Sequence, residues 1–230
     1  DRKFIKMDRE VISDTSPISF FRRPRNGINV DISFRCPLEC MRCQRQTNFT
    51  FHGRKVYGKD ATMDEVKKLA AHFTQLNFCG QLSDPVHHPK FPEILEYLYK
   101  NGNEASIHNA SSAKSEKFYI KCFEAHPDAK WIFGIDGMPE ESSMYRVNQD
   151  GEKLFKIMLK SKEYLTKSPS WQYIVFSYNE HNIQKAKDLA KKHGLMMIML
   201  HSSRWMAESD PLRPKSTEYN LQFQGYTRDE

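Results

Sequence analysis

Three of the five cysteines in this 230-residue chain lie within eight residues, with the spacing Cys36-x3-Cys40-x2-Cys43. They follow the run Gly27-Ile-Asn-Val-Asp-Ile-Ser-Phe34, which predicts a strand that ends just before the first cysteine. An iron–sulfur cluster is normally held by four cysteines. Three thiolates therefore predict a four-metal cubane in which one iron has no protein ligand and is free to bind another molecule.

A zinc site is the alternative use of these thiolates. Structural zinc is usually closed by a fourth Cys or His, and His52 lies nine residues after Cys43. On a chain of net charge +6, such a site would belong to a zinc-binding basic module that contacts nucleic acid. The basic residues are scattered and no recognition motif is present, so nucleic acid is the less favoured partner.

Composition indicates a globular protein with one large domain or two small ones, since 39% of the residues are hydrophobic and 28% are charged. No run approaches the roughly 18 apolar residues of a membrane span, and the first residues lack a signal-peptide core. An odd number of cysteines, three of them crowded together, is a poor disulfide framework. We therefore expect no membrane contact and a location in a reducing cytoplasm.

Apolar runs alternate with amphipathic segments along most of the chain, as in repeated strand–helix units. Helices are predicted from residue 62 or 63 and at about 90–100, 114–125, 150–165 and 180–193. Strands are predicted at about 28–34, 76–80, 104–108, 130–135, 171–176 and 195–200. The predicted domain spans residues 27–206, preceded by a lead-in at 1–26 and followed by a tail, or the start of a further extension, at 207–230.

This alternation predicts an α/β fold with a parallel sheet. Eight strands close a full barrel, and the chain has room for six. The favoured interpretation is a partial (β/α)6 TIM-like barrel with parallel strands and outer helices, and a doubly wound open sheet is the alternative. In a barrel the active groups lie at the carboxyl ends of the strands, where the cysteine motif is expected.

The cysteine motif, in a loop after the first strand, resembles the signature of the radical S-adenosylmethionine (SAM) enzymes, whose core fold is a six-stranded partial barrel. The resemblance implies that Cys36, Cys40 and Cys43 are metal ligands and catalytic residues that hold a [4Fe-4S] cluster, with SAM on the open iron. It also implies reductive cleavage of SAM to a 5′-deoxyadenosyl radical, which abstracts hydrogen from a substrate. The implied partners are an electron donor such as flavodoxin or ferredoxin and a peptide, protein or small-molecule substrate.

Segments at the ends of the second and third strands also resemble that family. Residues 80–85, Gly-Gln-Leu-Ser-Asp-Pro, look like a variant of its Gly-Gly-Glu-Pro segment, which holds the SAM amino group. Asn109 stands where the family has Thr-Asn-Gly and is expected to contact SAM or substrate. The implied cofactor-binding residues here are Gly80, Gln81, Ser83, Asp84 and Asn109.

The fourth strand ends in Gly134-Ile-Asp136-Gly137, with Tyr145-Arg146 ten residues on, which resembles the branch with a SPASM or twitch extension. In that branch the arginine pairs with the SAM carboxylate, and a guanidinium matches two oxygens at once. Gly134 replaces the usual serine. The implied cofactor-binding residues are Asp136 and Arg146.

Three further positions complete the expected SAM site. Asn179, after the fifth strand, is expected over the SAM ribose or as a helix cap. His201, after the sixth strand, is expected to border the adenine or the substrate. Arg42 stands where relatives carry an aromatic residue beside the adenine. No cysteine follows Cys122 to hold an auxiliary cluster, and a barrel that binds a cluster without catalysis is a further alternative.

Overall fold

The computed structural model describes residues 26–201, 209–216 and 219. The strands are β1 (Gly27–Asn29), β2 (Gln75–Phe78), β3 (Glu104–Asn109), β4 (Lys130–Gly134), β5 (Ser170–Val175) and β6 (Met196–His201). The α-helices are α1 (Gln44–His52), α2 (Met63–His72), α3 (Phe91–Lys100), α4 (Glu116–Ala125), α5 (Gly151–Ser161) and α6 (Ile183–Lys192). Within the described residues, three 3₁₀ turns lie between strands and helices: η2 (Pro85–His87), η3 (Pro139–Met144) and η4 (Glu180–Asn182).

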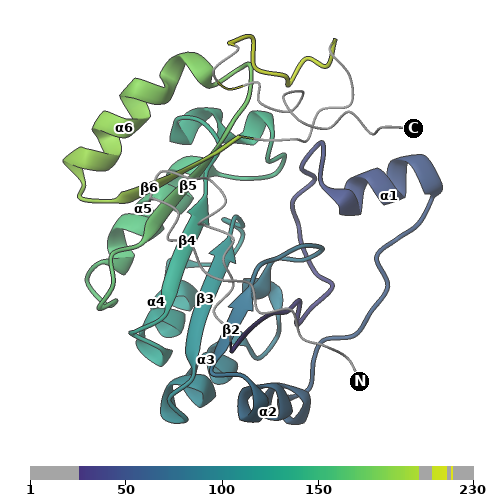
Figure 1. Ribbon diagram of the computed structural model, residues 1–230, viewed down its shortest axis with the longest axis vertical. Helices are drawn as coiled ribbons and strands as arrows, with labels where there is room; N and C mark the ends of the chain where they lie inside the picture. Colours follow the sequence, from purple (N-terminus) through teal and green to yellow (C-terminus); the bar gives the residue numbers. More distant parts are fainter. Residues whose placement is uncertain (1–25, 202–208, 217–218, 220–230) are drawn as a thin grey trace, which may run out of the picture.

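All six strands are parallel and pair in sequence order, from β1 to β6. A doubly wound sheet reverses its strand order at a switch point, whereas a barrel adds each new strand beside the previous one. The sequential order confirms the predicted partial (β/α)6 barrel. Every strand therefore ends at the same edge of the sheet, where the loops meet (Figure 1).

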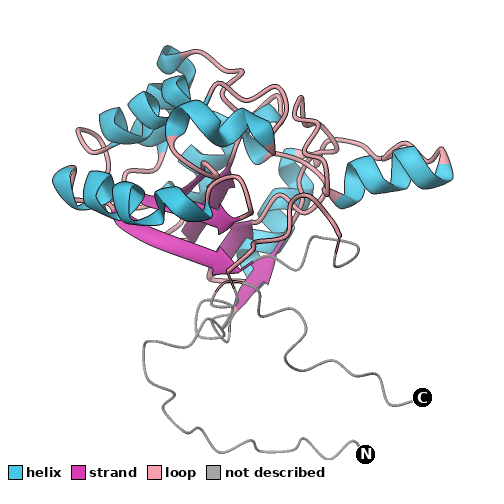
Figure 2. Cartoon of the chain, turned by 90° about the horizontal axis from the view of Figure 1, so that it is seen from above, coloured by secondary structure: helices cyan, strands magenta, loops and turns pink. Residues whose placement is uncertain are grey.

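Helices α2–α6 cover one face of the sheet, and side chains of alternate strand positions fill the space between the two layers (Figures 1 and 2). Aromatic rings dominate this outer core. The rings of Phe123 and Trp131 meet edge to face with centroids 4.9 Å apart, and Trp131 stacks on Phe133 at 5.7 Å. Burial of these apolar surfaces provides the main driving force for holding the helices on the sheet.

Local signals place the helix starts close to the predicted positions. Thr62 and Glu65 form a reciprocal capping box at α2, and Ser115 and Asp150 cap α4 and α5. The predicted helix at 150–165 is shorter, since α5 ends at Ser161. The predicted helix at 180–193 begins with the 3₁₀ turn η4 before α6.

Two differences from the predicted elements lie around the cysteine loop. Strand β1 ends at Asn29 rather than near residue 34, because the chain beyond Val30 pairs with the segment before α2, where Ala61 donates to the carbonyl of Ile32 at 2.8 Å. Helix α1 was not predicted at all. No described helix is both long enough and apolar enough to span a bilayer.

Candidate functional site at the strand ends

The loop that carries the cysteines spans the edge of the sheet between the ends of β1 and β4. Its backbone is bonded to residues 145–148: Glu39 donates to the carbonyl of Val147 at 3.1 Å and Met41 donates to that of Tyr145 at 3.4 Å. The Asn148 side chain donates to the carbonyl of Pro37 at 3.1 Å. Residues that are more than 100 positions apart in the sequence thus form one unit.

The three cysteines of this loop are free thiols, with Cys40 buried and the other two half-buried. Leu38 and Cys40 pack with the rings of Tyr145 and Phe176, which lie 4.3 Å apart. This small apolar cluster is separate from the outer core. It provides dry surroundings beneath the thiols.

Burial raises the pKa of the Cys36 thiol to about 12, and the nearby charge of Asp84 adds to the effect. A metal ligand must be a thiolate, so the positive charge of bound irons would have to offset this burial. Three free thiols in one dry, partly buried loop suit the soft ligand set of an iron–sulfur cluster.

The zinc alternative does not fit the geometry. Cys43 is the N-cap of α1 and His52 is its last residue. Nine helical residues extend roughly 13 Å, whereas Zn²⁺ needs its ligands within about 2.3 Å of the ion. No three His, Cys, Asp or Glu side chains in the described ranges gather closely enough to hold one metal ion. Ligands of different irons in a cubane lie farther apart than ligands of a single ion, so this finding does not oppose a cluster.

A charged pair lies beside the cysteine loop. The Nε of Arg146 is 2.7 Å from Oδ2 of Asp136, and the two side chains are 12% and 0% exposed. Burial acts to lower the pKa of Arg146, but Asp136 and the nearby Cys40 outweigh it, so the pKa lies above its usual value. The other carboxylate oxygen of Asp136 accepts from the backbone N–H of Ile174 at 2.8 Å. Asp136 therefore fixes Arg146 to the ends of β4 and β5.

The structure explains why glycine stands at position 134. A Cβ atom there would lie 2.7 Å from Nη2 and 3.0 Å from Cζ of Arg146. The arginine passes over this position, so any side chain would displace it. Glycine replaces the family's serine at the position that the Arg146 guanidinium covers.

Asp84 joins the loops after β2 and β3. Its carboxylate accepts backbone N–H groups of Val86 at 3.3 Å, Ala110 at 2.9 Å and Ser111 at 2.8 Å. Burial raises the pKa of Asp84 to about 6, although these N–H donors act against the increase. The carboxylate is thus occupied by backbone groups, and its observed role is to position the two loops.

The other expected residues after β2 lie in the same loop. Gly80 adopts φ +62°, and a Cβ would lie 2.6 Å from the carbonyl oxygen of Ser83, so glycine is required. The Ser83 hydroxyl donates to Asp31 at 2.9 Å, and Gln81 is exposed to solvent. The loop backbone, rather than the Ser83 side chain, is available to a ligand.

Asn109 and Asn179 are both buried and bonded within the protein. Tyr119 of α4 donates to Oδ1 of Asn109 at 3.2 Å, so this side chain lies under the helix. The Asn179 amide donates to the carbonyl of Ile174 and accepts from Phe176 N–H, at 2.9 and 2.8 Å. Asn179 therefore shapes the end of β5. Tyr119 also bonds the Ser111 carbonyl, so Asn109 lies beside the Ala110 and Ser111 N–H groups that Asp84 binds.

Residues 209–216, within the predicted tail, form a strap across the site. Arg42 donates twice to one oxygen of buried Asp210, at 2.7 and 3.2 Å. Ser177 N–H donates to the carbonyl of Leu212 at 3.1 Å, and Leu212 packs in the same cluster as Cys40. Arg42 therefore binds the strap through Asp210.

His201, at the end of β6, lies outside the strap, and its ring is 5.7 Å from that of Tyr219.

Sequence reasoning missed a polar lining on the face of the sheet opposite the helices. Asn77 donates to Asn29 at 3.2 Å, and His108 is hydrogen-bonded to Gln172. All four side chains are half-buried and occupy the strand positions that alternate with the buried apolar ones. That alternation was the available signal.

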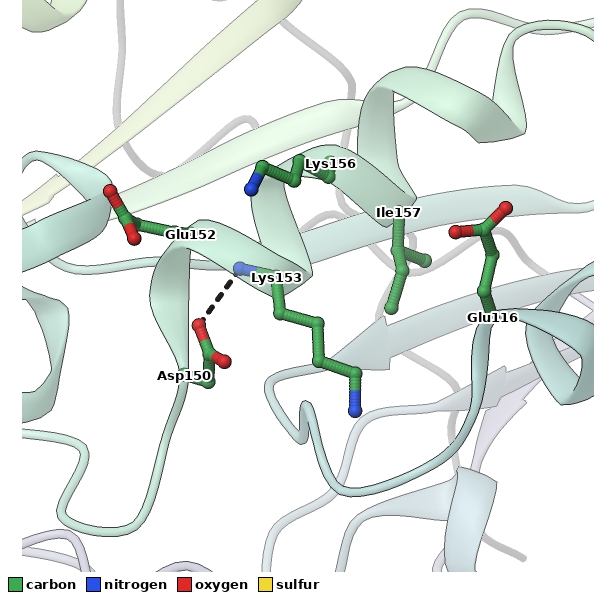
Figure 3. Close-up of a pocket in the computed structure, with 6 residues that line it drawn as sticks. All are labelled: Glu116, Asp150, Glu152, Lys153, Lys156 and Ile157. Atoms are coloured by element: carbon green, nitrogen blue, oxygen red, sulfur yellow. Dashed lines mark hydrogen bonds between the residues drawn. The ribbon is translucent and has the colours of Figure 1, made fainter.

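A separate pocket of about 230 Å³ lies where α4 and α5 begin (Figure 3). In it, Asp150 caps α5 by accepting from Lys153 N–H at 2.9 Å. The pocket is lined mostly by charged residues, namely Glu116, Asp150, Glu152, Lys153, Lys156 and Ile157. None of the predicted site residues lines it. We therefore assign it to the surface rather than to the candidate site.

Comparison with solved structures identifies several of similar fold. Native anSMEcpe with bound AdoMet aligns over 86% of this chain and 59% of its own, with 19% identity and a TM-score of 0.59. Streptococcus suis SuiB bound to S-adenosylmethionine aligns over 83% of this chain and 44% of its own, with 10% identity and a TM-score of 0.62. Methylornithine synthase (PylB) aligns over 85% and 59%, with 14% identity and a TM-score of 0.54.

These three proteins are radical SAM enzymes, and the chain shares their partial-barrel fold. It spans 59% or less of the length of each. No family model and no curated protein sequence matches the chain.

Proposed function

We propose that this chain is the catalytic barrel of a radical SAM enzyme. The observation that carries the proposal is the loop of Cys36, Cys40 and Cys43, free thiols at the end of the first strand of a six-stranded partial barrel. The loop is bonded to the segment that carries Arg146, a guanidinium held in place by Asp136. Thiolates for a metal cluster and a fixed cation for a carboxylate are thus close together.

The residues present fit both an iron–sulfur cluster and SAM. Cys36, Cys40 and Cys43 would hold a [4Fe-4S] cluster, and Arg146 would receive the SAM carboxylate. Arg146 uses Nε for Asp136, and its terminal nitrogens would bind the SAM carboxylate. When bound, the cluster supplies the electron that cleaves SAM reductively and so generates the 5′-deoxyadenosyl radical.

The remaining side chains set the surroundings of SAM. Asp84 fixes the two loops whose backbone groups border the site, and Asn179 fixes the end of β5. Arg42 and Asp210 hold the strap over the same region, which keeps water away from a reactive radical. Gly80, Gln81, Ser83, Asn109 and His201 lie in or near loops at this edge and remain candidates for contacts with SAM or substrate.

A peptide is the substrate class that we favour. Two of the structural neighbours hold peptides: SuiB is bound to its precursor peptide SuiA, and anSMEcpe is bound to the Cp18Cys peptide. In this chain the face opposite the helices presents Asn29, Asn77 and Gln172, uncharged amides whose donors and acceptors match those of a peptide backbone. The small-molecule alternative rests on the likeness to methylornithine synthase.

Formation of 5′-deoxyadenosine tests the reaction. The chain is purified without oxygen, reconstituted with iron and sulfide, reduced with dithionite and mixed with SAM. We expect about four irons per chain and 5′-deoxyadenosine from the native protein, and neither a full cluster nor product from Cys40→Ala. Cys122→Ala is the matched control, because Cys122 is buried in α4 and should leave both unchanged.

A barrel that binds a cluster without catalysis is the second candidate. It predicts about four irons and no 5′-deoxyadenosine, with or without peptides. A colourless protein that takes up zinc in place of iron would contradict both candidates.

A further inference from the structure

A surface arm extends from the cysteine loop. We define the arm as residues 44–59, which comprise α1 and the loop that follows it. No residue of α1 is buried, and the helix stands apart from the body of the molecule (Figures 1 and 2). Among the described contacts, Arg45 ties the arm to the barrel by donating to the carbonyls of Phe34 and Leu82. An isolated helix of this length is marginal in water, so contact with a partner would stabilise it.

The arm presents an unusual combination of side chains. From residue 44 to residue 59 the sequence has four Arg or Lys residues and no Asp or Glu. Phe49, Phe51 and Tyr57 are 51%, 59% and 85% exposed. Arg54 and Lys55 are exposed and form no ion pair with any residue that the structure describes. Aromatic rings beside unpaired cations are typical of the centre and rim of protein interfaces.

The arm begins at a candidate cluster ligand. Cys43 is the N-cap of α1, and its carbonyl accepts the N–H of Thr47 at 2.9 Å. The arm therefore starts at the third cysteine, and α1 carries its far end roughly 13 Å outward. Single-stranded nucleic acid is also attracted by mixed cations and aromatic rings, but it gains nothing from this position.

We propose that the arm is the docking surface for an acidic protein that carries one electron. This inference rests on the proposed function, in which a cluster must be reduced before SAM is cleaved. The carrier loses one electron and the cluster gains it, with no bond made or broken. Carboxylates on the carrier complement Arg54 and Lys55, which speeds encounter and makes it sensitive to salt. Phe49, Phe51 and Tyr57 supply the apolar contact.

Charge reversal on the arm tests the proposal. The variant Arg54→Glu/Lys55→Glu is compared with Lys191→Glu/Lys192→Glu, which makes the same charge change on exposed positions of α6. The probe is flavodoxin, an acidic one-electron carrier. Binding of oxidised flavodoxin is measured by titration, and reduction of the cluster is followed by loss of its visible absorption, with either reduced flavodoxin or dithionite.

We expect the arm variant to bind flavodoxin at least tenfold more weakly, and to be reduced about tenfold more slowly by flavodoxin at low salt. Reduction by dithionite should be unchanged, because a small ion needs no docking surface. The α6 variant should match the native chain in every measurement. Phe51→Ser should weaken binding severalfold without removing the salt dependence.

Three results would overturn the proposal. They are failure of the native chain to bind flavodoxin, binding of flavodoxin by the arm variant as tightly as by the native chain, and slower reduction of the arm variant's cluster by dithionite as well as by flavodoxin. Binding of a single-stranded oligonucleotide that is lost in the arm variant, without flavodoxin binding, would assign the arm to nucleic acid. Failure of the proposed function gives a different result, namely no 5′-deoxyadenosine with dithionite while flavodoxin docking persists.

Discussion

Strand β4 separates two regions that are stabilised by different means. On one side, Trp131 and Phe133 belong to the aromatic outer core beneath the helices. At its end, Gly134 and Asp136 form the charged rim with Arg146. The outer core rests on many interchangeable apolar contacts, whereas the rim rests on a few pairs for which no neighbour can substitute.

This contrast separates stability from chemistry. Apolar burial is non-directional, so the outer core can lose a methyl group and keep the fold. A buried charge needs its partner at a defined distance, so the rim fixes the position of a guanidinium beside the thiols. We therefore expect changes in the outer core to alter stability alone, and changes in the rim to alter both stability and SAM binding.

The largest effect is expected from Arg146→Met, which leaves the carboxylate of Asp136 buried without its cation. Removal of one partner of a buried pair costs about 3–5 kcal/mol in the free energy of unfolding. Urea denaturation measures this loss, and equilibrium dialysis should show that SAM binding is abolished. The double variant Arg146→Met/Asp136→Asn should regain part of the stability but none of the SAM binding.

Arg35→Met is the control for that prediction, because Arg35 pairs with Asp60 at 2.8 Å but is 50% exposed. Exposed pairs are screened by water and contribute little. Its unfolding midpoint should stay close to that of the native chain. Equal losses in the two variants would mean that the rim pair is no different from a surface pair.

Gly134→Ala is expected to have the next largest effect. The added Cβ would lie 2.7 Å from the Arg146 guanidinium, and crowding of this kind costs about 1–3 kcal/mol. The displaced arginine should also weaken SAM binding, as measured by dialysis. Gly58→Ala is the control, since a Cβ there meets Phe34 at an ordinary 3.4 Å. Unchanged SAM binding in Gly134→Ala would show that the arginine adjusts freely.

The order of strands and helices could be predicted from the sequence because burial leaves a local pattern. Strands β4 to β6 are short, mostly apolar runs, and β2 and β3 alternate polar with apolar residues. Helices α2 to α6 each have an apolar face. Helix α1 was missed for the same reason, since none of its residues is buried and no apolar period marks it. The prediction carried strand β1 too far along the chain, because Ile32 is buried like a strand residue but does not pair in the sheet.

The positions of the site residues could be predicted only where a motif is local. The three cysteines and the Asp136–Arg146 spacing lie within short segments and come together in the structure. The pairing of Arg42 with Asp210 joins residues 168 positions apart and leaves no local pattern. The direction of a side chain such as Asn109, which lies under α4, depends on strand register and was likewise not predictable.

Ile107→Val tests the outer core with a smaller change. Ile107 lies on β3 and is fully buried beneath the helices. Loss of one buried methylene costs about 0.5–1.5 kcal/mol, which urea denaturation can measure. Formation of 5′-deoxyadenosine per folded molecule should be unchanged. A drop in that rate would show that the outer core and the rim are coupled more tightly than the contrast between them suggests.

The last effect is confined to acid pH and concerns a histidine that lies between the two regions. His87 in η2 is hydrogen-bonded to the Ser111 hydroxyl at 2.8 Å, and burial lowers its pKa to about 4. The unfolded chain takes up a proton near pH 6.5, while the folded chain resists it until about pH 4. The stability from neutral His87 is therefore present above pH 6.5 and is lost as the pH falls toward 4. Urea denaturation at several pH values gives the slope of the free energy of unfolding against pH, which counts the protons taken up on unfolding. His87→Gln should reduce this count by up to about one proton between pH 6.5 and 4. An unchanged slope would assign the acid sensitivity to other groups.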